Sequence, residues 1–330
     1  GEAMGEEAAA QEVAVLLGPG LNIQRSPLCG RDFEYFSEDP ILAGKMAAAY
    51  VRGIQKKGIA ACPKHFAVNS QELRRMASDS VVDERTLREL YLTGFEIVVK
   101  EARPKTIMTS YNLINGTYAN ENAHLLQDIL RKDWGFDGAV VTDWGGSNDH
   151  ALGVKNGSTL EMPCPGGDSI RELMKAVQDG KISEADVDAR LDEMLELVLS
   201  THAAVEKAPR TFDAAAHHKL ARRAAAESIV LLRNEGGILP LKPNEKLAVI
   251  GDFAETPRYQ GAGSSAVNAL QVDTLLDSIK ADDSGITFVG YASGFERQGA
   301  ADAEKLEEAV ALAKKADTVL LCLGLDELRE

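Results

Sequence analysis

The sequence has few cysteines and no long apolar run. Its four cysteines, Cys29, Cys62, Cys164 and Cys322, are far apart and form neither a CxxC motif nor a Cys/His metal spacing. We therefore expect four separate thiols and no metal site. No apolar run approaches the roughly 20 residues of a membrane span, so the sequence predicts no membrane segment.

Positive charge is also scarce. The chain has 36 Lys and Arg residues against 51 Asp and Glu residues, a formal net charge of −15. This balance argues against non-specific binding to nucleic acid or to an anionic membrane surface. Separate thiols favour a reducing, cytoplasmic location. A secreted or periplasmic location stays open, because residue 1 falls inside a helical pattern and a leader could lie upstream.

What is present is an alternation of strand and helix patterns over 330 residues, a length that suggests two domains. Strands are predicted at 13–19, 59–66, 106–112, 139–144 and 159–163, with helices at 41–58, 83–102 and 120–136. This spacing is typical of parallel β/α units. We expect an α/β protein with a TIM-like (β/α) barrel over residues 1–201, whole or incomplete, whose first strand would precede residue 1.

A second domain is predicted after a linker. Residues 168–201 read as helical, with a break at Gly180 and a new start at Ser183, and residues 202–216 contain Pro209 and show no period. Residues 217–330 then read as an α/β sandwich with a mostly parallel sheet, truncated at its C-terminal side. Its predicted elements are a helix at 213–227, strands at 228–234, 246–254, 286–292 and 317–324, and a helix at 302–316.

Polar residues collect where the barrel strands end, which is where β/α barrels carry their chemistry. These strand ends are Lys64-His65, Ser110-Tyr111-Asn112, Asp143-Trp144 and Glu161-Met162. Cationic donors, an imidazole and aromatic faces suit a neutral polyhydroxylated ligand, and a carboxylate among them suits a nucleophile or a base.

Each of these residues also has a simpler interpretation. Asp143 could cap the following helix. Lys64 and His65 could be a solvated pair, Arg31 could tether its loop through a nearby glutamate, and Tyr111 could be a core residue. Lys64 would also suit a Schiff-base aldolase, which would require a lysine desolvated by burial.

Several long stretches carry a more specific pattern. They are "LGPGLNIQRSPLCGRDFEYFSEDP" (17–40), "KHFAVNSQELRRMASDSVVDERTLREL" (64–90), "IMTSYNLINGTYANEN" (107–122), "GFDGAVVTDWGG" (135–146), "LEMP" (160–163), "ESIVLLRNEGGILPL" (227–241) and "YQGAGSS" (259–265). In this order they resemble glycoside hydrolase family three, in its β-glucosidase-type branch. The resemblance implies retaining hydrolysis of terminal non-reducing β-D-glucosyl residues from β-glucosides or oligosaccharides, without a cofactor, and leaves a homo-oligomer possible.

The resemblance also implies roles for individual residues. The aspartate of the "TDW" strand end, Asp143, would be the nucleophile that forms the glycosyl-enzyme. The sugar-binding subsite would contain Arg31, Lys64, His65, Arg75 (with Arg74 as the alternative) and Tyr111, and Met108 and Trp144 would border it.

The chain departs from the family pattern in three places. The family's earlier "DGP"-type segment is not in this sequence. Thr159 stands where the family usually has an aspartate. The glutamate that acts as general acid/base would fall just past Glu330, in an expected remainder of the polypeptide.

The "KHFAVNSQE" stretch lacks the second histidine of the "KHFPGHG" type, which argues against an N-acetylglucosaminidase. A β-xylosidase, or a dual-specificity glycosidase, remains an alternative. So does a catalytically incomplete sugar-binding fragment.

Overall fold

The computed structural model describes residues 1–298 and 300–326. The chain divides into two compact units, Gly1–Phe212 (unit 1) and Asp213–Glu330 (unit 2). The domain boundaries and the 202–216 linker expected from the sequence stay a prediction.

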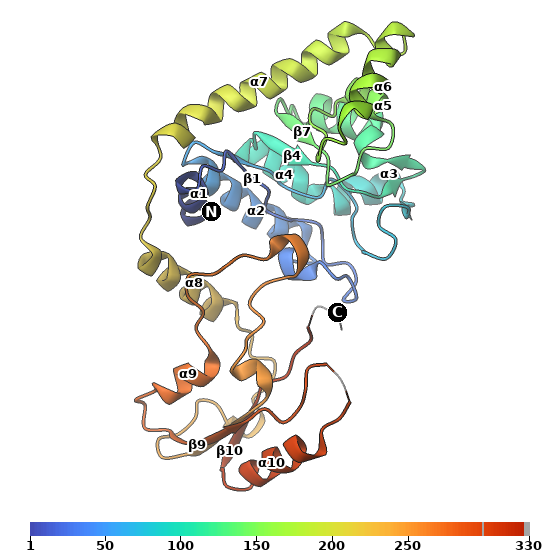
Figure 1. Ribbon diagram of the computed structural model, residues 1–330. Coiled ribbons are helices and arrows are strands. Elements are labelled where there is room, and N and C mark those ends of the chain that lie inside the picture. Colours follow the sequence, from blue (N-terminus) through green and yellow to red (C-terminus); the bar gives the residue numbers. More distant parts are fainter. Residues whose placement is uncertain (299, 327–330) are drawn as a thin grey trace. The chain divides into compact units, whose positions relative to one another are not determined.

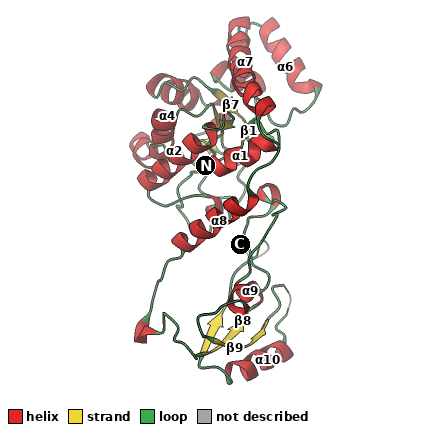
Figure 2. Cartoon of the chain, turned by 90° about the vertical axis from the view of Figure 1, so that its left-hand side faces the viewer, coloured by secondary structure: helices red, strands yellow, loops and turns green. Residues whose placement is uncertain are grey.

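Unit 1 alternates short strands with longer helices, and Figure 2 shows the helices around the strands. Its strands are β1 (Val15–Leu16), β2 (Ala60–Ala61), β3 (Asp79–Ser80), β4 (Thr106–Met108), β5 (Leu113–Ile114), β6 (Thr117–Tyr118) and β7 (Ala139–Val141). Its α-helices are α1 (Glu2–Ala10), α2 (Pro40–Gln55), α3 (Glu84–Thr86), α4 (Thr93–Ala102), α5 (His150–Asn156), α6 (Gly167–Gln178) and α7 (Glu184–Lys207). The segments Leu87–Tyr91 and His124–Asp133 are π-helical.

The main strands of unit 1 form one parallel wall. β1 pairs with β2 and β4 pairs with β7, both in parallel. A parallel bridge between Phe66 and Thr109 joins the second strand segment to the third, and another between Val141 and Leu160 adds a fifth segment. The predicted α/β class with parallel strands is thereby confirmed. Within residues 1–298 and 300–326 the wall does not close into a complete barrel.

The side chains of this wall fill its inner side in layers, as in β/α barrels. Near the strand starts, Ala60 and Ala139 pack against Leu197 of α7. One layer further along, Cys62, Met108 and Val141 form the next cluster. Because α7 lies against the strand starts, the opposite strand ends are the ones left for a binding site.

Local sequence explains where the main helices begin and end. α2 begins after Asp39, whose carboxylate accepts hydrogen bonds from the next free backbone amides, and Pro40 occupies the first helical position. α7 begins with a capping box between Ser183 and Asp186. The predicted break at Gly180 and restart at Ser183 match these bounds.

α7 runs six residues past the expected end at 201, as far as Lys207 (Figure 1). Alanine and other good helix formers continue the helix. Pro209 then disfavours helical geometry at Ala208, which adopts an extended conformation. The first part of the expected linker is therefore helical.

Unit 2 contains a parallel three-stranded sheet in the order β10-β8-β9. Its elements are α8 (Ala214–Ser228), β8 (Lys246–Ile250), α9 (Leu275–Lys280), β9 (Thr287–Ala292), α10 (Ala303–Ala313) and β10 (Thr318–Leu321). Val249 packs in a cluster with Leu276 of α9, and its neighbour Ile250 packs with Ala309 of α10. Successive residues of a strand point to opposite faces, so both faces of the sheet are covered, as a sandwich requires.

One strand predicted for unit 2 is wrong. Residues 228–234 form no strand, and the side chains from Ile229 to Leu232 are exposed. An apolar run becomes a strand only when a neighbouring strand accepts its backbone hydrogen bonds. Among the residues that the structure describes, this run has no such neighbour.

Candidate active site

The strand ends of unit 1 bring Asp143, His65 and Arg31 together. Asp143 lies two residues after β7, and its Oδ2 atom is 3.6 Å from His65 Nε2 and 3.9 Å from Arg31 Nη1. The side chain of Asp143 is 13% exposed and that of His65 is 1% exposed. These residues are more than 30 positions apart in the sequence. His65 and Asp143 follow the strand segments on either side of β4 in the parallel wall, and Arg31 lies in the loop after β1.

Asp143 has one satisfied and one unsatisfied oxygen. Oδ1 accepts a hydrogen bond from the Trp144 backbone amide at 2.8 Å. Oδ2 is buried and, within the described residues, has no hydrogen-bond partner, and the same holds for His65 Nε2. A buried carboxylate oxygen without a partner is costly, so these two atoms mark a place where a ligand's polar group would be stabilised.

The helix-cap interpretation of Asp143 is not supported. The helix that follows, α5, begins at His150 and is capped by Asp149, whose Oδ1 accepts from the Leu152 amide at 2.9 Å. Asp143 lies six residues before this cap. Its position is therefore not explained by helix capping.

His65 is held on three sides. The Asn22 amide accepts from the His65 backbone N–H at 2.8 Å and donates to its carbonyl at 2.9 Å. On the ring, Nδ1 lies 3.2 Å from the Tyr35 hydroxyl. Burial, helped by the charges of Arg31 and Lys64, lowers the pKa of His65 well below its usual range, so the ring is neutral.

Glu34 holds the cations at the rim of the site. Its carboxylate bonds to Arg31, and Lys64 Nζ lies 3.8 Å from its other oxygen. Burial opposes the charge of Arg31, but the pKa of this guanidinium is raised because carboxylates such as Glu34 outweigh burial. The predicted tether of Arg31 is thus present, together with its approach to Asp143. Lys64 thus pairs with a carboxylate at the rim, and its role as a Schiff-base lysine stays a hypothesis.

Tyr111, Arg75 and Trp144 form the aromatic part of the site. The Arg75 guanidinium stacks over the Tyr111 ring at 4.5 Å and bonds to Glu72 at 2.8 Å. The Tyr111 hydroxyl donates to the Trp144 carbonyl at 2.8 Å. Burial, with the nearby charge of Asp143, raises the pKa of Tyr111 to about 12. The alternative residue Arg74 is exposed.

The two residues predicted to border the pocket differ in exposure. Trp144, which follows Asp143 in the chain, is 48% exposed. Met108 is 2% exposed and belongs to the interior layer with Cys62 and Val141. A role for Met108 at the pocket border stays a prediction.

Sequence reasoning missed four residues that connect this site: Asn22, Tyr35, Asn69 and Glu72. Asn69 donates to the Tyr35 hydroxyl at 3.3 Å and to Glu72 at 3.0 Å. All four lie inside the quoted motif stretches, which is the signal that could have selected them. Their roles come from contacts between residues distant in sequence, such as Tyr35 with His65, and a linear pattern does not display those contacts.

The structure also bears on the predictions about metal binding, membrane spanning and the cysteines. Over residues 1–298 and 300–326, no group of three or more His, Cys, Asp or Glu side chains is arranged to hold a metal. No helix in that part of the chain is long and apolar enough to cross a membrane. The four cysteines are free thiols. Glu330, next to the predicted acid/base, lies outside the described residues.

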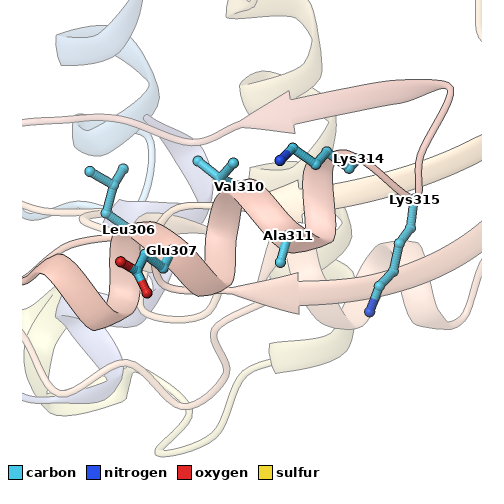
Figure 3. A pocket seen from close by; sticks show the side chains of 6 residues that line it. All are labelled: Leu306, Glu307, Val310, Ala311, Lys314 and Lys315. Atoms are coloured by element: carbon cyan, nitrogen blue, oxygen red, sulfur yellow. The ribbon is translucent and has the colours of Figure 1, made fainter.

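Unit 2 has a shallow hollow on the outer side of α10 (Figure 3). It is lined by Leu306, Glu307, Val310, Ala311, Lys314 and Lys315. Four of these side chains come from α10, and Lys314 and Lys315 follow its end. Leu306 and Val310 are about half exposed. The hollow contains none of the residues predicted for the site.

Comparisons with known proteins identify both units. Residues 1–197 match the family model for the glycosyl hydrolase family 3 N terminal domain, and residues 229–330 match the family 3 C-terminal domain. A thermostable beta-glucosidase B from Acetivibrio thermocellus is 45% identical over 330 residues, covering 99% of this chain and 43% of that protein. An exo-alpha-(1->6)-L-arabinopyranosidase from Bifidobacterium breve is 46% identical over 340 residues, covering 100% of this chain and 44% of that protein.

Solved structures show the same likeness. A family 3 beta-glucosidase from Bifidobacterium adolescentis superposes with a TM-score of 0.92 at 44% identity, over 99% of this chain and 48% of that one. Beta-glucosidase 3B from Thermotoga neapolitana in complex with glucose gives a TM-score of 0.83 at 39% identity, over 95% of this chain and 43% of that one. The present chain thus spans less than half the length of these relatives.

Proposed function

The chain belongs to glycosyl hydrolase family 3, and from this premise we propose that it carries the nucleophile and sugar-binding residues of a retaining β-glucosidase. The substrate would be a terminal non-reducing β-D-glucosyl residue of a β-glucoside or oligosaccharide. The observation that carries the proposal is the unsatisfied Oδ2 of Asp143, buried beside His65 and Arg31 at the end of a parallel strand. The names of the beta-glucosidase relatives support this substrate class.

In the proposed reaction, the Asp143 carboxylate attacks the anomeric carbon. The new bond to Oδ2 forms as the glycosidic C–O bond breaks, and a second carboxylic acid gives its proton to the leaving oxygen. That second group then takes a proton from water, which displaces Asp143 and releases the sugar with its β configuration. Retention requires the two carboxyl groups to lie about 5–5.5 Å apart. The second group stays a prediction, expected just past Glu330.

The neighbouring residues would bind the sugar. Arg31 and Lys64 donate to hydroxyl oxygens as fixed cations, and neutral His65 can donate or accept a hydrogen bond. Arg75 would add a further donor beside the Tyr111 ring. Trp144 would offer its exposed face to the C–H surface of the sugar. The proposed reaction requires only an acid and a nucleophile, so it needs no metal or cofactor.

The nucleophile is tested by Asp143→Asn. The amide keeps the size of the side chain but cannot form the glycosyl ester, so turnover of an aryl β-D-glucoside should fall at least about a thousandfold. The melting temperature should stay close to that of the parent. In Asp143→Ala, added azide should restore release of the aryl group and yield the inverted glycosyl azide.

The matched control for this test is Asp149→Asn. It makes the same chemical change six residues away, at a cap position where Asn functions as well as Asp. This variant should keep its turnover. Normal activity in Asp143→Asn would show that Asp143 is not the nucleophile.

A second candidate substrate is an α-L-arabinopyranoside. The observation that favours it is the likeness to two Bifidobacterium exo-alpha-(1->6)-L-arabinopyranosidases, each 46% identical to this chain. Arabinopyranosides and xylosides both lack the hydroxymethyl group of glucose. A panel of aryl β-D-glucoside, β-D-xyloside and α-L-arabinopyranoside separates these activities by kcat/KM. Binding of glucose without turnover of any of the three would instead identify a sugar-binding fragment.

A further inference from the structure

Tyr35 lies beside the proposed sugar site. Its hydroxyl contacts His65 on one side and, through Asn69 and Glu72, is linked to Arg75 on the other. Its side chain is 5% exposed, and its ring lies edge-on to the imidazole with centroids 6.2 Å apart. Its hydroxyl is 3.2 Å from His65 Nδ1, and Asn69 Nδ2 is 3.3 Å from the same hydroxyl. The hydroxyl therefore links the histidine to a longer chain of hydrogen bonds.

The charges of Arg75 and Glu72 decide which group donates and which accepts in each hydrogen bond of that chain. Arg75 only donates and the Glu72 carboxylate only accepts, with 2.8 Å between them. Glu72 also faces the Asn69 side-chain amide at 3.0 Å, which must present its nitrogen because an oxygen there would repel the carboxylate. The second N–H of that nitrogen donates to the Tyr35 oxygen. The Tyr35 proton is then free to donate to Nδ1 of His65.

The surroundings of Nε2, on the other side of the imidazole, independently indicate that the ring proton is on Nε2. Nε2 faces Asp143 Oδ2 at 3.6 Å, where a proton is attracted by the carboxylate and a lone pair would be repelled. The ring is neutral, since burial lowers the pKa of His65, so it carries only one ring proton.

We propose that Tyr35 is a positioning residue that holds neutral His65 with its proton on Nε2. The site then presents a donor, rather than an acceptor, at the point where Asp143 and a sugar hydroxyl would meet. The consequence for turnover rests on the proposed glycosidase function, whereas the tautomer itself does not. The substrate hydroxyl at this point would accept a hydrogen bond from His65.

The opposite tautomer leaves groups unpaired. With the proton on Nδ1, the Tyr35 oxygen would receive two donors, from His65 and Asn69, and its own proton would have no acceptor in this network. The lone pair on Nε2 would also point toward Asp143. Leaving buried polar groups unpaired costs stability, which disfavours this arrangement.

The tautomer can be read directly by nitrogen NMR of the full chain labelled with 15N-histidine. The His65 signals are assigned as those lost in His65→Gln. We expect the parent protein to show a protonated Nε2 and a hydrogen-bonded, unprotonated Nδ1. In Tyr35→Phe, the chemical shift of Nδ1 should move to the value of an unprotonated ring nitrogen that accepts no hydrogen bond. A parent protein protonated on Nδ1, or unchanged His65 signals in Tyr35→Phe, would overturn the proposal.

Kinetics supply the second readout. Tyr35→Phe leaves the buried Nδ1 atom of His65 without its donor, so kcat/KM for an aryl β-glucoside should fall about tenfold. Tyr50→Phe is the matched control, because the Tyr50 hydroxyl contacts Met4 of α1 and no site residue. Its NMR signals and kinetics should match the parent.

The two proposals fail separately. If the full-length polypeptide, which would supply the second carboxyl group, hydrolyses no aryl glycoside, the proposed function fails, and the NMR signals still decide the role of Tyr35. If the parent hydrolyses the glucoside but Tyr35→Phe shows parent-like kcat/KM, the positioning role is overturned and the proposed function stands.

Discussion

Glu193 of α7 is the centre of a partly buried ionic cluster in unit 1. Its carboxylate lies 2.9 Å from Arg131 and 2.7 Å from Arg190, and it accepts a hydrogen bond from the Thr159 hydroxyl. Thr159 is the position where the family pattern has an aspartate. A hydroxyl can donate to Glu193, whereas an ionised aspartate would place a second negative charge beside it. The departure in sequence is therefore matched to the charge of this cluster.

We predict that Glu193→Gln destabilises unit 1. The Glu193 side chain is 12% exposed and both arginines are 14% exposed, so the substitution leaves two poorly hydrated guanidinium groups without their shared carboxylate. Breaking a buried ion pair on one side costs about 3 kcal/mol or more. Urea unfolding followed by circular dichroism measures the loss.

The control for this prediction is Glu206→Gln on the same helix. Glu206 is 68% exposed and pairs only loosely with His202 at 3.7 Å, so its substitution should leave the unfolding curve nearly unchanged. Equal effects of the two substitutions would mean that the Glu193 cluster does not stabilise the fold.

At the residue scale, some of the site could be predicted from sequence and some could not. Asp143, His65 and Arg31 stand at strand ends or in motifs, and the structure brings His65 and Arg31 within 4 Å of Asp143. Whether Asp143 capped a helix could not be decided, because that depends on where α5 begins. Tyr35 lies inside a motif stretch, but its role could not be predicted, since its partner His65 is 30 residues away in the sequence.

At the element scale, α2 and α4 of unit 1 pack closely against each other. Gly44 of α2 faces Gly94 of α4, and a Cβ atom at Gly44 would lie 3.0 Å from the Gly94 Cα and from the Ile97 Cβ. Two glycines thus allow the helix backbones to approach. A glycine inside a helix costs about 0.5–1 kcal/mol relative to alanine, and here the packing offsets that cost.

We predict that Gly44→Ala destabilises the chain by about 1–2 kcal/mol. The overpacking cost of typically 1–3 kcal/mol exceeds the gain in helix propensity. Gly167→Ala at the start of α6 is the control, because its Cβ would meet only the flexible end of the Arg171 side chain. The control should be neutral or stabilising in thermal unfolding. A stabilised Gly44→Ala would show that α2 and α4 can separate without cost.

The elements of unit 1 were more predictable than those of unit 2. Each expected strand segment near residues 15, 60, 107, 140 and 160 takes part in the parallel wall, because apolar runs bounded by helical patterns are typical of buried strands. The run at 228–234 has the same apolar pattern and forms no strand. Whether an apolar run becomes a strand depends on a neighbouring strand that can pair with it. The sequence of the run itself does not show whether such a neighbour exists.

At the scale of the whole molecule, the hydrophobic clusters follow the two units. The largest cluster, which includes Val140 of β7, draws its residues from unit 1. The clusters around Val249 and Ile250 of β8 draw theirs from unit 2. Each unit therefore has a core of its own, which is the property expected of a domain.

We predict that damage to one core stays within its unit. Val140→Ala and Val249→Ala make the same change at two valines that are both 0% exposed, and each should cost about 2 kcal/mol through lost burial and a cavity. Amide hydrogen exchange read by mass spectrometry should then accelerate over 1–212 in the first variant and over 213–326 in the second, because local stability follows the core that supports it. The two variants act as controls for each other. Faster exchange in β4 and β7 caused by Val249→Ala would contradict this independence and would mean that the two units unfold as one.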